Sequence, residues 1–212
     1  RWEQHSEFTT YTWELPSQPD GIPFHPSAAA LAAPMQLVPQ PGPLLVAIDM
    51  HVLADGPAVQ PPERLFDRNS LALAENSDGA AIYATDFQPD PSGFVRILIV
   101  DRKLNPDRAG ALAQRVIEIE TYRTLALLGL PEAQRLAPSI STVEQRLAEV
   151  TDKMRNNGNL ADNRHLLDEL TALAAEVEAG AAASVFRFGA SRAYYEIVQQ
   201  RLTTIGERKV AG

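Results

Sequence analysis

The pattern of apolar and polar positions along the chain changes near residue 105. Before that point, strand-like runs rich in β-branched and aromatic residues alternate with loops of Pro, Gly, Asp and Ser. We predict strands over residues 7–15, 43–53, 79–88 and 93–103. The second of these has the strongest apolar character and is predicted to be a central strand, whereas the last two flank a five-residue turn-forming loop and predict an antiparallel hairpin.

After residue 105 the apolar positions recur at helical spacing. Asn105 followed by Pro106 has the composition of a helix start, and Gly129 with Pro131 that of a helix end. Ser141 and Glu144 have the spacing of a capping box, which predicts a second helix start. The pattern predicts four helices, at about 106–129, 141–156, 160–179 and 185–207.

Strands followed only by helices are typical of an α+β fold. We therefore predict a mostly antiparallel sheet of about four strands within residues 7–103, with the four helices packed on it. The distribution of proline supports this division into a strand-rich and a helical part. Of the 16 prolines, which disfavour helix interiors, 14 lie within residues 1–106. The predicted organisation is a strand-and-loop part, 1–104, and a helical part, 105–212, forming one structural unit.

Charged residues fall on the apolar stripes of two predicted helices. Glu120 and Arg123 lie within the apolar arc of the first helix, and Arg187 and Arg201 within that of the last. One hypothesis is an internal polar network in which Glu120 accepts from an arginine where these helices pack together. The other is a site at which Arg123 binds an anion or a partner's carboxylate. The network is the preferred interpretation.

Composition excludes several classes of protein. The chain has 212 residues, of which 45% are hydrophobic and 22% charged, as in soluble globular proteins. Its net charge of −8 argues against a nucleic-acid partner, because phosphate contacts need clustered Lys and Arg. There is no cysteine to form a disulfide or a thiolate site. No apolar run is long enough to be a spanning helix.

Candidate catalytic residues are few. His51 and Asp49 lie on the same face of a predicted strand and could form a His–carboxylate dyad, but no nucleophile motif accompanies them. Asp86, Asp90 and Asp101 lie around the predicted hairpin and could bind a divalent cation. The four histidines lack zinc-ligand spacing, and no glycine-rich phosphate loop is present. We predict no catalytic, cofactor-binding or metal-ligating residue, and no cofactor.

Several segments carry a family resemblance: RWEQHSEFTTYT, GFVRILIVDR, QRVIEIETYRTLALLGLP and FRFGASRAYYEIV, in this order. On these segments the chain resembles the bacterial family of unknown function DUF3422, whose members are predicted to be membrane-anchored. The resemblance runs across essentially the whole chain. It implies a longer parent protein with a membrane tether outside this chain, on an unknown side of the membrane, and it implies no activity.

The expected function is a non-enzymatic interaction or scaffolding role for the soluble central portion of a membrane-anchored protein. Two alternatives stay open: a regulatory cytosolic domain of an ion channel or transporter, and a hydrolase with a non-standard site around His51. The leucine stripe of the 160–179 helix either closes the domain or pairs with a second copy of the chain. Other partners are unknown.

Overall fold

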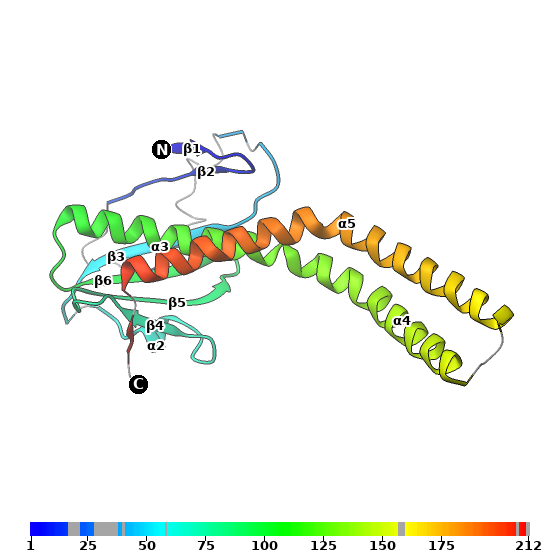
Figure 1. Ribbon diagram of the computed structural model, residues 1–212. Helices are drawn as coiled ribbons and strands as arrows, with labels where there is room; N and C mark the ends of the chain where they lie inside the picture. Colours follow the sequence, from blue (N-terminus) through cyan, green and yellow to red (C-terminus); the bar gives the residue numbers. More distant parts are fainter. Residues whose placement is uncertain are drawn as a thin grey trace. The chain divides into compact units, whose positions relative to one another are not determined.

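The computed structural model describes residues 1–16, 22–27, 38–39, 41–57, 59–156, 160–206 and 208–210 (Figure 1). The chain forms two compact units, which are described separately. The sheet unit comprises Arg1–Thr121 and Gln199–Gly212, and the hairpin unit comprises Tyr122–Val198. The unit boundaries therefore lie within helices, whereas the change in composition lies near residue 105.

The sheet unit contains a five-stranded sheet in the order β3-β6-β5-β4-β7. Its strands are β3 (Ala47–Ala54), β4 (Ala72–Glu75), β5 (Ala81–Pro89), β6 (Phe94–Asp101) and β7 (Arg208–Lys209), with the short helix α2 (Pro62–Leu65) between β3 and β4. All neighbouring strands are antiparallel except β3 and β6, which are parallel. The predicted α+β class, the mostly antiparallel sheet and the β5–β6 hairpin are thus confirmed.

Three details of the strand prediction were wrong. Within the described residues β3 pairs with β6 alone, so it is an edge strand and not a central one. The run at residues 7–15 contributes only β2 (Thr9–Tyr11), which pairs with β1 (Trp2–Gln4) in a separate two-stranded sheet. β4 was missed, because its four residues, ALAE, carry little strand preference. Pairing with β5 and β7 makes it a strand.

Both faces of the five-stranded sheet carry a core. On one face, Ile97 and Ile99 of β6 pack with Leu112 and Val116 of α3 (Pro106–Leu127) and with Ile205. On the other, Leu98 and Val100 pack under Phe24 and Phe66. β6 is buried on both faces, which explains its nearly continuous apolar sequence.

Beyond residue 105 the described residues form three helices where four were predicted, and two of the three are longer than predicted. α3 starts where expected: the Asn105 side chain accepts from the Arg108 N–H at 2.9 Å. α4 runs Gly129–Asn156 and α5 runs Leu160–Ile205. The predicted start at residue 141 and the predicted break near residue 180 were therefore both wrong.

Packing between α4 and α5 explains these two errors. Pro138 lies inside α4 and removes one helical hydrogen bond, but Leu136 and Val143 on either side of it are partly buried, which offsets that loss. Gly180 lies inside α5 where a Cβ would come within 3.9 Å of the Leu136 side chain. It brings the two helices close together without ending α5.

Candidate functional site

Polar side chains cluster on one face of three adjacent strands in the sheet unit. Asp49 of β3 is the register partner of Arg96 of β6, and His51 lies two residues further along β3. Arg96 Nη2 lies 3.4 Å from Asp86 Oδ2 on β5. By the period of two, this is the face that carries Leu98 and the Phe24–Phe66 core.

Arg96 is the centre of this cluster. Its guanidinium carbon lies 5.5 Å from the ring centroids of both Phe24 and Phe66, within the range of cation–π attraction. The Asp86 side chain is almost completely buried and accepts from the backbone N–H of Asp67 at 3.0 Å and of Gln88 at 3.2 Å. Together, Arg96 and Asp86 hold the segments around Phe24 and Phe66 against the sheet.

His51 and Asp49 lie close together, as predicted, but the His51 ring also binds the backbone of Phe24. His51 Nε2 accepts from the Phe24 N–H at 3.2 Å and lies 3.5 Å from Asp49 Oδ1. A catalytic dyad directs its carboxylate to one ring nitrogen and leaves the other to take a proton from the substrate. Here both contacts share Nε2, so the imidazole fastens the backbone at Phe24 to β3.

The aspartates that were candidates for binding a divalent cation instead accept hydrogen bonds from backbone N–H groups, each in a different part of the chain. Asp90 Oδ1 accepts from Ser92 N–H at 2.8 Å and from Phe94 N–H at 3.0 Å. Asp101 Oδ1 accepts from Leu104 N–H at 2.7 Å. Across the residues that the structure describes, no group of three or more His, Asp and Glu is placed to hold a metal ion.

The four residues of the predicted polar network lie in two units. Glu120, in the sheet unit, is only 2% exposed. Arg201, also in the sheet unit, donates from Nε to Glu118 Oε2 at 2.5 Å. Arg123 and Arg187 are half-buried in the hairpin unit, where Arg187 lies beside Glu132. The predicted pairing of Glu120 with an arginine across the helices stays a prediction.

In the hairpin unit, α4 and α5 lie antiparallel (Figure 1), and buried or partly buried positions along them are spaced seven residues apart. Val150 on α4 and Leu166 and Leu173 on α5 are buried, and Leu136, Val143 and Gly180 are partly buried. Sevenfold spacing is the repeat of a coiled-coil seam. At one end of this seam Gly129 lies so close to Ser191 that a Cβ would come within 2.5 Å of the hydroxyl oxygen.

One edge of this seam is ionic. Arg146 and Lys153 each lie three residues beyond a seam position of α4, and Glu169 and Glu176 three beyond a seam position of α5. Arg146 lies 3.8 Å from Glu176, and Lys153 lies 3.9 Å from Glu169. Two ion pairs between α4 and α5 therefore cover this side of the seam.

The opposite edge is apolar. A residue three positions beyond a seam position is rotated about 60° around the helix axis to one side of the seam. A residue four positions beyond it is rotated about 40° to the opposite side. Because the helices are antiparallel, residues rotated by this angle meet on the same side of the seam. On α4 these are Ile140, Leu147 and Met154, which are 53%, 46% and 51% exposed. Val177 of α5, at the same offset from Leu173, is 51% exposed, and Leu167, one residue beyond the seam residue Leu166, is 62% exposed. We call these five residues the apolar edge.

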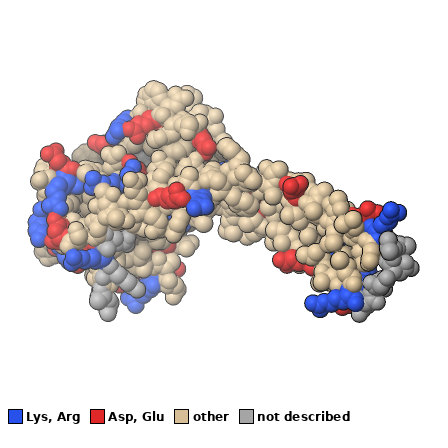
Figure 2. Space-filling view, viewed as in Figure 1, with Lys and Arg blue, Asp and Glu red and all other residues tan. Residues whose placement is uncertain are grey.

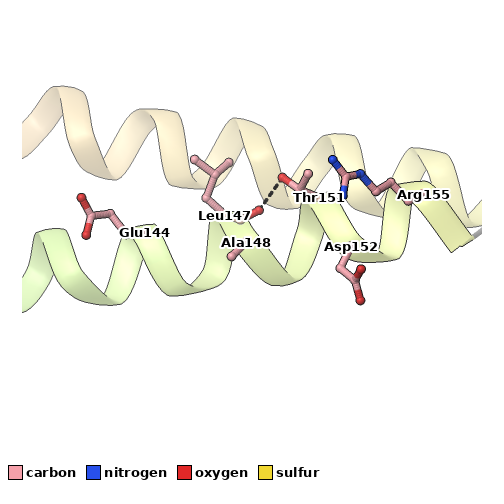
Figure 3. Close-up of a pocket in the computed structure, with 6 residues that line it drawn as sticks. All are labelled: Glu144, Leu147, Ala148, Thr151, Asp152 and Arg155. Carbon is pink, nitrogen blue, oxygen red and sulfur yellow. Dashed lines mark hydrogen bonds between the residues drawn. The ribbon is translucent and has the colours of Figure 1, made fainter.

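An open groove of about 470 Å³ runs beside the apolar edge along α4. It is lined by Glu144, Leu147, Ala148, Thr151, Asp152 and Arg155 (Figure 3). Leu147 and Thr151 lie on the side of α4 nearer α5, whereas Ala148 and Asp152 lie on the other side. The Thr151 hydroxyl donates to the Leu147 carbonyl at 2.7 Å, so it presents mainly its methyl group.

A polar contact joins α4 to α5 near Gly129, at the start of α4. Glu132 accepts from Arg135 Nη2 at 2.7 Å and from the buried Ser184 hydroxyl of α5 at 2.6 Å. These two hydrogen bonds lower the pKa of Glu132 to about 2, with a further contribution from the positive charge of Arg187. Glu132 therefore remains ionised and joins α4 to α5 across the pH range in which proteins work.

Sequence reasoning missed two of these features, and each had a signal. Arg96 is the single charge inside FVRILIV, a run that otherwise has the composition of a buried strand. The apolar edge was missed because the predicted helix began at residue 141. Extending the repeat through Pro138 would have added Leu136 and Ile140 to the stripe.

The described residues define an α+β sheet unit and a helical hairpin with one ionic and one apolar edge. The chain belongs to the family described as "Protein of unknown function (DUF3422)", whose model matches residues 1–212. No curated protein and no solved structure matches the chain significantly. Within the described residues, no helix combines the length and apolar character that a membrane span needs.

Proposed function

We propose that this chain is a non-enzymatic interaction module whose helical hairpin binds a protein partner through its apolar edge. The sheet unit is the second folded unit of this module. In the parent protein, a tether outside this chain holds the module at a membrane, as the family resemblance implies.

The observation that carries this proposal is the difference between the two edges of one seam. Two inter-helix ion pairs cover one edge, whereas five large apolar side chains on the other are between 46% and 62% exposed. Contiguous exposed apolar surface is a common mark of a protein-binding site. In Figure 2, the hairpin shows long uncharged stretches, with Lys and Arg gathered near the α4–α5 connection.

The polar cluster of the sheet unit has a structural role in this proposal. Arg96, Asp86 and His51 direct their polar atoms to backbone and aromatic groups of the same unit. Their contacts order the segments that cover the sheet.

In-cell photo-crosslinking tests the proposal. A photoreactive phenylalanine analogue replaces Leu147 or Val177 on the apolar edge, and Glu149 of α4 serves as the matched exposed control. The expected result is a protein adduct at both apolar positions and little at residue 149. Equal labelling at all three positions, or no adduct at Leu147 and Val177, would contradict the proposed function.

A further inference from the structure

One ring nitrogen of His51 makes two contacts that need different protonation states of the imidazole. His51 Nε2 accepts from the Phe24 N–H at 3.2 Å, so in this contact it carries no hydrogen and the neutral ring holds its proton on Nδ1. Asp49 Oδ1 lies 3.5 Å from the same nitrogen. Because a carboxylate oxygen only accepts, this second contact becomes an ion pair with a hydrogen bond once Nε2 gains a proton. The two contacts therefore exclude each other.

A proton can reach this nitrogen, and a partner for the charged ring is in place. The His51 side chain is 27% exposed, and that of Asp49 is 11% exposed. Both residues belong to β3, so their contact does not depend on the segment that carries Phe24. The charged imidazole thus keeps a carboxylate beside it when that segment moves away, and this favours the protonated state.

The other charged groups around the imidazole lie on neighbouring elements. Arg96 on β6 is the register partner of Asp49 and is paired with the buried Asp86 on β5. His25, on the covering segment, is exposed. The charged side chains of the segment that carries Phe66 are exposed as well: Glu63, Arg64, Asp67 and Arg68. Asp49 is therefore the carboxylate that a proton on this ring engages.

The position of Phe24 depends on the hydrogen bond that protonation removes. Phe24 is 7% exposed, and its ring packs edge-on against the His51 ring, with centroids 4.8 Å apart, and against that of Phe66, 5.7 Å apart. A proton on Nε2 sets two N–H groups against each other and leaves the Phe24 N–H without its acceptor. A buried donor without an acceptor is costly, and it regains a partner when it moves into water.

We propose that His51 is a pH-dependent switch that holds residues 22–27 on the sheet. The neutral ring binds the Phe24 N–H, whereas the protonated ring pairs with Asp49 and releases this segment. Release uncovers the part of the apolar face around Leu98, which packs under Phe24 in the folded unit. The change falls within about pH 5–8, the interval in which histidine side chains gain their proton. It concerns the sheet unit and does not depend on the proposed role of the hairpin.

A pH titration followed by NMR of the 212-residue chain tests this switch. At pH 8 the Phe24 amide is expected to be protected from exchange, and its ring to show nuclear Overhauser contacts with Phe66. As the His51 ring gains its proton, both signals should be lost with the same midpoint. Protection of the Phe24 amide should fall about tenfold, the equivalent of one lost hydrogen bond. The amide of Ile99 in β6 is the internal reference and should stay protected.

Three variants assign the transition to its groups. His51→Gln offers an acceptor that does not titrate, so the Phe24 amide should stay protected from pH 8 to pH 5. Asp49→Asn removes the partner of the charged ring and should move the transition to lower pH. His25→Gln is the matched control, because His25 is exposed next to Phe24, and it should leave the transition unchanged.

Two results from the unmodified chain would overturn the inference, even if a variant failed to fold. One is a Phe24 amide that stays protected, or keeps its ring contacts, while the His51 ring titrates. The other is a His51 ring that stays neutral down to pH 5. Loss of protection that persists in His51→Gln, or that disappears in His25→Gln, would assign the transition to a different group and would overturn it too.

Discussion

The Arg201 guanidinium donates from Nε to Glu118 Oε2 at 2.5 Å and so joins the last turns of α5 to α3 within the sheet unit. The two side chains are 32% and 25% exposed, which places the pair between a surface ion pair and a buried one. Ile205, four residues beyond Arg201, is buried against the sheet. The ion pair thus lies beside the point at which α5 enters the core.

A double-mutant cycle of Arg201→Met and Glu118→Gln should show a coupling energy of about 1 kcal/mol, since partial exposure weakens the attraction. Urea unfolding of the four proteins in the cycle measures it. The matched control is Arg192–Glu196, an i,i+4 pair whose side chains are 82% and 65% exposed. That cycle should show about 0.3 kcal/mol. Equal coupling in both cycles would mean that Arg201 gains nothing from its position.

Glu120→Gln should lower the free energy of unfolding by about 3 kcal/mol, because the side chain is 2% exposed and the predicted network would lose the carboxylate that pairs with its arginine. Glu149→Gln, at an exposed position of α4, should change it little. Thermal melting followed by circular dichroism compares the two. An unchanged melting temperature for Glu120→Gln would show that the carboxylate is solvated in solution.

Acid should weaken the hairpin through Glu132. Its folded-state pKa of about 2 lies below its ordinary value of 4.5, so the folded state favours the ionised carboxylate. This contribution to stability is fully present above about pH 5 and is lost as the pH falls toward 2. Comparison of melting temperatures with Glu132→Gln across this range tests the assignment. The difference between the two proteins should shrink on acidification, and a constant difference would contradict it.

Gly206→Ala should destabilise the sheet unit by about 1–2 kcal/mol. Gly206 has a φ of 66° at the end of α5, and a Cβ there would lie 2.9 Å from the side chain of Ser77. Gly189→Ala is the control, because Gly189 lies inside α5 and a Cβ there meets nothing within 4 Å. That change should stabilise the chain by about 0.5–1 kcal/mol, as alanine favours helix. Chemical denaturation of both variants measures the change in the free energy of unfolding, which should be negative for Gly206→Ala and positive for Gly189→Ala.

Arg96→Lys should cost about 1–2 kcal/mol despite retaining the charge, because an ammonium group lacks the flat surface that contacts both Phe24 and Phe66. Arg102→Lys, at a more exposed position of the same unit, is the comparison and should have little effect. Urea titrations measure both differences. If the two substitutions prove equivalent, ring contacts contribute nothing at Arg96.

Local chemistry explains which parts of the fold could be predicted. Asn105 with Pro106 satisfies the first N–H groups of α3 from within a few residues, so the helix start is visible in the sequence. The β5–β6 hairpin likewise depends on the turn residues between its strands. The partner of β3 could not be predicted, because its parallel pairing with β6 joins strands about forty residues apart in the chain.

The sequence by itself determined that a strand-rich part precedes long helices, that β5 and β6 form a hairpin and that α3 starts after Asn105, since each follows from local spacing and turn chemistry. Only the tertiary structure decided that α4 continues through Pro138 and α5 through Gly180, because packing between the helices offsets their unfavourable local preferences. The same packing decided which side chains of the repeat became buried. It left Ile140, Leu147 and Met154 half-exposed, because a two-helix seam covers only the positions that face the other helix.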